Sequence, residues 1–320
     1  MMLRGLTAYR GAAAGWAGWA AGTRPAETAI RPAWGAARAF SASAATRKTE
    51  PVELVFQKLE VPKGTERSGQ PPILILHGLF GSKQNNRTVG KIFARDLGRD
   101  VYVMDLRNHG HSPHAPQHDY PALALDVEHF IDTHGLGPSV VIGHSMGAKT
   151  AMAVALRRPE LVSQLVSVDN APIDAALSSD FPKYVRALKS IERAGVPRIK
   201  DAYAMLAKFE PDINIQHFLL TNAEIKPSGK VGFRVPVDTI GKSLDHVADF
   251  PFHPDEARYE GPTLFIRGTR SHYVPDEAIP VIGRFFPRFV LKDVEAGHWL
   301  ISENPGRFVE LVEDFLGDQD

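Results

Sequence analysis

Ten consecutive residues, Val140-Val141-Ile142-Gly143-His144-Ser145-Met146-Gly147-Ala148-Lys149, give the first indication of a fold and a chemistry. They fit the pattern Gly-x-Ser-x-Gly, with an apolar run before it and the helix-forming residues 148–156 after it. A buried strand, a tight turn and a helix are what a nucleophile elbow needs. The turn strains the serine backbone, so Gly143 and Gly147 supply the small residues required on either side of Ser145. A turn that fits the pattern by chance is the alternative, and the flanking strand and helix argue against it.

Length and composition indicate an ordinary globular chain. The 320 residues suffice for one large α/β domain or two small ones, and a formal net charge of zero gives no reason to expect a nucleic acid as partner. The chain has no cysteine, which excludes disulfides, thiolate catalysis and cysteine metal sites. The histidines show no metal-ligand spacing, so we expect neither a metal nor another cofactor. We expect His109, His111 and His114 to be solvated loop residues.

The N-terminal segment, residues 1–47, differs from the rest of the chain. It contains six arginines and a single acid, Glu27, and is otherwise rich in alanine, glycine and serine. This composition is typical of a mitochondrial transit peptide, and Arg38-Ala39-Phe40 followed by Ser41 resembles a matrix-peptidase site. The longest uncharged run, residues 11–23, is too short to span a membrane. We therefore predict a protein of the mitochondrial matrix without an integral membrane segment, and the alternative is a disordered tail without targeting function.

Strands and helices alternate from residue 48 to the end, residue 320. Residues 73–76 form a short continuous apolar run, which is typical of a strand buried on both faces of a parallel sheet. The alternation predicts the α/β class, with a doubly wound, mostly parallel sheet. Strands are predicted over 52–59, 73–76, 101–104, 140–142, 165–168, 263–266 and 289–291, and helices over 89–97, 120–134, 148–156 and 305–316.

Residues 173 to about 255 change character. They are helical in pattern, carry many prolines and contain no clear buried strand. We interpret them as a helical cap inserted into the domain, above the ends of the strands.

A serine hydroxyl is a weak nucleophile until a positioned base removes its proton. His298, in a loop between the last predicted strand and the final helix, is the natural base for Ser145. An oxyanion hole needs two backbone N–H groups, one of them from the residue after the nucleophile, which is Met146. The second is expected from the loop after residues 73–76, from Leu79 or its neighbour Phe80.

Four loops carry a family resemblance: His77-Gly78-Leu79-Phe80-Gly81-Ser82, Asp105-Leu106-Arg107-Asn108-His109-Gly110-His111-Ser112, Gly143-His144-Ser145-Met146-Gly147-Ala148-Lys149 and Gly297-His298-Trp299. Together they resemble motifs of one branch of the α/β-hydrolase superfamily. That branch includes small bacterial esterases, mitochondrial abhydrolase-domain proteins and yeast ethanol acetyltransferases, and the similarity covers about residues 52 to 317. The resemblance implies a cap-bearing serine hydrolase whose substrates carry short or medium acyl groups.

The acid that orients the base departs from the usual superfamily pattern. Its usual superfamily position is the loop after residues 263–266, where Ser271 stands instead of an aspartate. We favour Asp169, at the end of a neighbouring strand, because its carboxylate would fix the tautomer of the imidazole and stabilise the imidazolium. The resemblance to small bacterial relatives implies that a serine at the position of Ser271 assists. Asp238, in the predicted cap, is the rival, and Asp276 is a further alternative.

The expected function is hydrolysis of acyl esters or thioesters through an acyl-serine intermediate. The alternative is transfer of the acetyl group of acetyl-CoA to an alcohol, with hydrolysis as a side activity, because both reactions use the same base and oxyanion hole. A protein that has lost catalysis and keeps the fold only to bind a partner is the alternative from another functional class. The intact nucleophile elbow argues against it. We expect Lys149 to make structural hydrogen bonds and an acyl pocket to be lined by Phe80, His144, Trp299, Phe181 and Tyr184.

Overall fold

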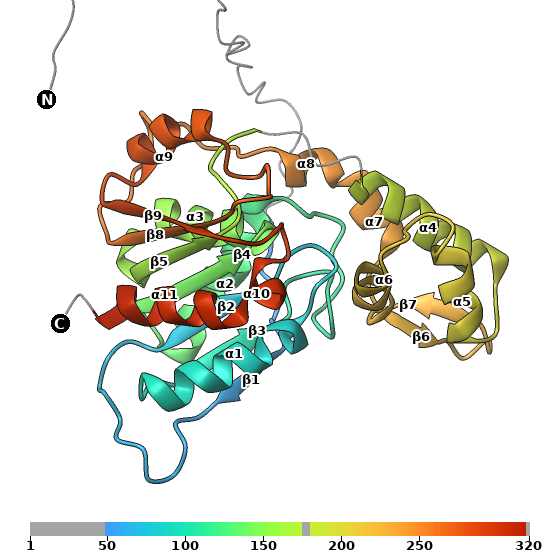
Figure 1. Ribbon diagram of the computed structural model, residues 1–320, viewed down its shortest axis with the longest axis horizontal. Helices are drawn as coiled ribbons and strands as arrows, with labels where there is room; N and C mark the ends of the chain where they lie inside the picture. Colours follow the sequence, from blue (N-terminus) through green and yellow to red (C-terminus); the bar gives the residue numbers. More distant parts are fainter. Residues whose placement is uncertain (1–48, 175–179, 318–320) are drawn as a thin grey trace, which may run out of the picture. The chain divides into compact units, whose positions relative to one another are not determined.

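Seven strands form one sheet at the centre of the computed structural model, which describes residues 49–174 and 180–317. The predicted leader, residues 1–47, lies outside the described residues. The strands are β1 (Phe56–Leu59), β2 (Ile73–Leu76), β3 (Val101–Met104), β4 (Ser139–His144), β5 (Val162–Val168), β8 (Thr263–Gly268) and β9 (Phe289–Val294). Their order is β1-β3-β2-β4-β5-β8-β9, and every neighbouring pair is parallel except β1 and β3 (Figure 1). The predicted mostly parallel α/β sheet is therefore confirmed.

Helices cover both faces of this sheet, as a doubly wound fold requires (Figure 1). They include α1 (Lys83–Asp96), α2 (Tyr120–His134), α3 (Met146–Arg157), α9 (Ile279–Phe285), α10 (Leu300–Glu303) and α11 (Pro305–Gly317). Along β2, Ile73 and Ile75 pack in one apolar cluster with α1 and α11. Leu74 and Leu76 pack in the other, with α2, α3 and α9, because successive strand side chains point to opposite faces.

The segment before β1 differs from the strand predicted over residues 52–59. Only Phe56–Leu59 pairs with β3. The backbone N–H of Val52 instead donates to Oδ1 of Asp126 on α2, at 2.8 Å. This amide is bonded to a side chain, so the alternating pattern of residues 52–55 does not produce a longer strand.

An insertion between β5 and β8 corresponds to the predicted cap. Its helices are α4 (Asp180–Ala194), α5 (Ile199–Leu206), α6 (Ile213–Leu220), α7 (Val237–Lys242) and α8 (Leu244–Ala248). It also contains an antiparallel pair, β6 (Ala223–Ile225) and β7 (Val231–Phe233), and β7 is buried. The expectation that this segment has no buried strand is therefore wrong. Each of the two strands has three residues, which is too short for a recognisable alternation.

The cap contacts the sheet at the carboxyl ends of its strands. Nδ2 of Asn222, in the cap, donates to the carbonyl oxygen of Phe80, in the loop after β2, at 2.7 Å. Strand β2 is parallel to β4, so this loop lies at the same edge of the sheet as Ser145, where parallel α/β sheets carry their sites. No helix within the described residues is both long enough and apolar enough to cross a membrane.

Candidate active site

Ser145 lies at the turn between β4 and α3. Its backbone has φ 55° and ψ −117°, a strained conformation for a residue with a side chain. A Cβ atom at Gly143 would lie 2.0 Å from the carbonyl oxygen of Gly147, and one at Gly147 would lie 2.5 Å from the carbonyl oxygen of Leu76. Both contacts are far shorter than atoms tolerate, so the expected need for glycine at both positions is confirmed.

A chain of hydrogen bonds joins Ser145 to Asp169 through His298. Nε2 of His298 lies 2.9 Å from Oγ of Ser145, and Nδ1 lies 2.7 Å from Oδ2 of Asp169. The hydroxyl donates to Nε2 while Nδ1–H donates to the carboxylate, which fixes the tautomer that a general base needs. Asp169 is fully buried at the end of β5, and its two oxygens also accept hydrogen bonds from Gly268 N (3.0 Å) and Ser271 Oγ (2.5 Å).

The two alternative acids lie elsewhere. Asp238, on α7, is exposed and forms an ion pair with Lys189, whose Nζ is 2.7 Å from Oδ1. Asp276 is also exposed and pairs with Arg267 at 2.6 Å. The structure therefore brings Asp169 to the imidazole and brings Ser271 to Asp169, but it does not place Asp238 or Asp276 there.

Backbone N–H groups are available for an oxyanion at two of the three predicted positions. Among the hydrogen bonds of the described residues, none uses the N–H of Leu79 or of Met146. The N–H of Phe80 instead donates to Nε2 of His109 at 3.1 Å. Phe80 is therefore a correction to the predicted set, because its amide is already bonded inside the protein.

His109 is a second correction. It is fully buried rather than solvated, and burial lowers its pKa well below the usual value, so the ring stays neutral. Its Nδ1–H donates to the carbonyl oxygen of Arg107 at 2.9 Å, which leaves Nε2 to accept from Phe80 N. His109 thus holds the loop that carries Leu79. His111 and His114 are exposed, as expected.

Two further aromatic rings hold the base. Tyr273 stacks on His298 with ring centroids 4.0 Å apart. Nε2–H of His144 donates to the carbonyl oxygen of His298 at 2.7 Å. Burial and the neighbouring His298 lower the pKa of His144 to about 4, so it is neutral near pH 7 and its Nδ1 is a hydrogen-bond acceptor. No pattern in the sequence indicates the contact between Tyr273 and His298.

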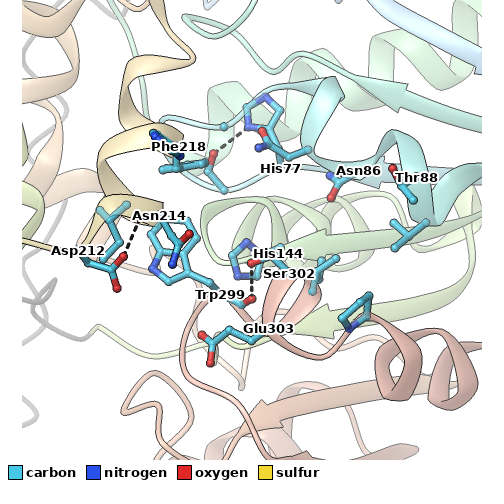
Figure 2. A pocket seen from close by; sticks show the side chains of 18 residues that line it. His77, Asn86, Thr88, His144, Asp212, Asn214, Phe218, Trp299, Ser302 and Glu303 are labelled. Carbon is cyan, nitrogen blue, oxygen red and sulfur yellow. Dashed lines mark hydrogen bonds between the residues drawn. The ribbon is translucent and has the colours of Figure 1, made fainter. Parts of the chain in front are cut away.

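A cavity of about 690 Å³ lies beside the elbow (Figure 2). Figure 2 shows that its walls come from the cap (Asp212, Asn214, Phe218), from α1 (Asn86, Thr88) and from the segment after His298 (Trp299, Ser302, Glu303). Of the predicted pocket walls, His144 and Trp299 line it. Phe80, Phe181 and Tyr184 instead pack on one another in the core, with Phe80 stacked on Phe181 at 6.4 Å.

Lys149 connects the elbow helix to both ends of the cap. Its Nζ donates to the carbonyl oxygens of Ile173 (2.9 Å), Ala248 (2.7 Å) and Asp249 (3.1 Å). Burial lowers the pKa of Lys149 to about 8. The predicted structural hydrogen bonds of Lys149 are confirmed.

Comparisons with known proteins agree with this architecture. Residues 71–305 match the family described as alpha/beta hydrolase fold. A Saccharomyces cerevisiae protein named "Probable alcohol acetyltransferase" is 40% identical, over 84% of this chain and 85% of its own. The Mus musculus "sn-1-specific diacylglycerol lipase ABHD11" is 39% identical, over 77% of this chain and 81% of its own. A solved "Marine microorganism esterase" is 32% identical with a TM-score of 0.75, covering 82% of this chain and 99% of its own.

Proposed function

The chain belongs to the α/β hydrolase fold family and is an esterase- or lipase-like enzyme, and from this premise we propose that it hydrolyses short or medium acyl esters or thioesters through an acyl-Ser145 intermediate. The observation that carries the proposal is the hydrogen-bond chain from Ser145 through His298 to Asp169, at 2.9 and 2.7 Å. A strained serine, a neutral base and a buried carboxylate in this order are the parts that acyl transfer needs.

The first half-reaction transfers the acyl group to the enzyme. Oγ of Ser145 attacks the carbonyl carbon while Nε2 of His298 takes the hydroxyl proton. The oxyanion accepts hydrogen bonds from the N–H groups of Leu79 and Met146, at the positive end of α3. The tetrahedral intermediate then expels the alcohol or thiol, which receives the proton from His298. Asp169 remains ionised and stabilises the imidazolium.

The second half-reaction decides between two functions. Water activated by His298 releases a carboxylic acid, whereas an alcohol in the same position produces a new ester. The name of the Saccharomyces cerevisiae relative favours alcohol acetyltransfer from acetyl-CoA as the second candidate. Hydrolysis is our first choice because water is always present at high concentration.

A product analysis distinguishes the two. The purified protein is given acetyl-CoA with and without ethanol, and free acetate and ethyl acetate are measured separately. We expect acetate to be the main product at modest ethanol concentration. Ethyl acetate as the main product would replace hydrolysis by the acetyltransferase function.

We also propose that the protein acts in the mitochondrial matrix after cleavage near Phe40 and Ser41. The support is the arginine-rich, acid-poor composition of residues 1–47. Mass spectrometry of the N-terminus of the protein from its native cells tests this. A mature N-terminus close to Ser41 is expected, and an intact Met1 or Met2 would rule the proposal out.

A further inference from the structure

The loop after β2 makes a tight turn around the N–H of Leu79, the expected second donor to an oxyanion. The N–H of Gly81 donates to the carbonyl oxygen of Gly78 at 2.9 Å, which closes the turn. This carbonyl and the N–H of Leu79 belong to one trans peptide group, in which they point in opposite directions. Groups that hold the carbonyl of Gly78 therefore also fix the direction of the Leu79 N–H.

His77 is one of these groups. Its Nε2 accepts from the backbone N–H of Leu106 at 3.0 Å, so Nδ1 carries the proton. Nδ1–H then donates to the carbonyl oxygen of Gly78 at 2.8 Å. His77 is buried, and burial lowers its pKa, which keeps the ring neutral. This support comes from the loops that follow β2 and β3.

A further contact reaches the same turn from the cap. Nδ2 of Asn222 donates to the carbonyl oxygen of Phe80 at 2.7 Å. That carbonyl belongs to the same peptide group as the N–H of Gly81, which donates to Gly78. The hydrogen bonds therefore form one chain, which starts at Asn222, passes through two peptide groups and ends at the N–H of Leu79. Because hydrogen bonds in a chain polarise one another, Asn222 strengthens the final donor as well as directing it.

Phe80 depends on such support. Its φ of 62° lies in the left-handed region, which is unfavourable for an aromatic residue. Phe80 is fully buried, so water cannot replace a lost donor to its carbonyl. Its N–H donates to His109, and its ring stacks on Phe181 of α4. Two of these three contacts, from Asn222 and Phe181, come from the cap.

Asn222 is itself fixed on the cap. It follows α6, and its own carbonyl oxygen accepts from the N–H of Arg234 at 2.9 Å. It is 2% exposed and is not among the residues that line the cavity. Asn222 therefore acts on the turn and not on a substrate.

We propose that Asn222 is a positioning residue of the reaction, which orients and polarises the Leu79 N–H from the cap so that this group stabilises the oxyanion. The inference rests on the proposed esterase function, because the oxyanion belongs to its tetrahedral intermediates. It gives the cap a part in the chemical step. The oxyanion forms only after the substrate has bound, so loss of this contact lowers kcat and leaves KM nearly unchanged.

The kinetic test uses hydrolysis of p-nitrophenyl acetate by Asn222→Leu, which lacks the donor and has a similar volume. Both half-reactions pass through an oxyanion, so both are slowed. We expect kcat to fall by about 10- to 100-fold, less than the loss of a whole oxyanion donor causes. We expect KM to change by less than about threefold.

Gln216→Leu is the matched control. Gln216 is also a buried amide of the cap, but its Nε2 donates to the carbonyl oxygen of Glu210 inside the cap, at 2.7 Å. We expect its kcat to stay within about twofold of the wild type, because the turn around Leu79 keeps its contacts.

Inhibition by a trifluoromethyl ketone supplies a readout that a weakened cap alone would not change. Oγ of Ser145 adds to the ketone carbon, the hydroxyl proton passes to His298, and the ketone oxygen becomes an oxyanion. We expect Asn222→Leu to raise the inhibition constant by the same factor by which it lowers kcat/KM, while Gln216→Leu leaves the constant unchanged. Asn222→Asp keeps the shape and replaces the donor by an acceptor, so it provides the same test if Asn222→Leu folds poorly.

Several results would overturn the proposal. They are a kcat near the wild-type value in folded Asn222→Leu or Asn222→Asp, a loss that lies wholly in KM, an inhibition constant that does not follow kcat/KM, or an equal effect of Gln216→Leu. A wild-type protein that cleaves no ester or thioester would instead contradict the proposed function itself, so the two failures are distinguishable.

Discussion

At the scale of single residues, Asp169 is the assignment that separates this site from the usual superfamily pattern. Changing Asp169 to asparagine keeps the shape but removes the charge that stabilises the imidazolium and fixes its tautomer. We expect kcat to fall by about 10³- to 10⁴-fold with the fold intact. Steady-state kinetics and circular dichroism measure the two properties.

Asp238→Asn is the matched control, because Asp238 is exposed and paired with Lys189. We expect this change to alter kcat less than about twofold, since exposed ion pairs contribute little. A large loss with Asp238→Asn and a small one with Asp169→Asn would reverse the assignment.

The sequence identified Ser145, His298 and Asp169, and the structure brings these three side chains together. The elbow and the histidine loop are local motifs, so they can be recognised without knowing the fold. The sequence favoured Asp169 but left Asp238 open. The structure excludes Asp238 because β5 lies next to β8, and the loop after β8 carries Ser271, whose Oγ donates to Asp169. The hydrogen bond between Phe80 and His109 joins two loops far apart in sequence, and nothing in either loop alone predicted it.

At the scale of elements, Lys149 holds α3 to both ends of the cap. Replacing it with methionine would leave three carbonyl oxygens without their charged donor. We expect Lys149→Met to lower the free energy of unfolding by about 2–5 kcal/mol and to open the chain near Ile173 or Ala248 to proteases. Urea denaturation and limited proteolysis measure these effects.

Lys189→Met serves as the comparison, because Lys189 makes a partly exposed ion pair on the cap. We expect this substitution to lower the free energy of unfolding by less than about 1 kcal/mol. Equal effects of the two substitutions would show that Lys149 does not secure the cap.

The elements were predictable where the apolar pattern is continuous. Strands β2 and β3 have the bounds expected from their apolar runs. Helix α1 begins at Lys83 rather than at the predicted residue 89. Its first turn is polar, so the apolar pattern does not reveal it. The N–H of Ser82 donates to Oδ1 of Asn85 in this turn, at 2.7 Å. The pair of β6 and β7 is too short to leave a pattern in the sequence.

At the scale of the whole molecule, buried neutral histidines make stability depend on pH. Burial lowers the pKa of His118 to about 3, and burial together with His298 lowers that of His144 to about 4. An unfolded histidine titrates near 6.5, so below that pH the unfolded state binds more protons than the folded state. The free energy of unfolding must therefore fall as the pH falls from 6.5 towards 4.

At pH 5 each of these two residues is expected to reduce stability by about 2 kcal/mol relative to pH 7. Urea denaturation at both pH values measures the change. His118→Asn should show a smaller loss than the wild type, because it removes one titrating group. A wild-type stability equal at pH 7 and pH 5 would contradict the prediction.

The central claim is that Ser145 is the nucleophile of an acyl-transferring site. The most direct measurement is the intact mass of the folded protein after treatment with a fluorophosphonate, whose phosphorus is attacked by an activated serine with loss of fluoride. We predict one adduct per chain, on the peptide that contains Ser145, and none on folded Ser145→Ala. An unlabelled wild-type protein, or equal labelling of the variant, would contradict the account.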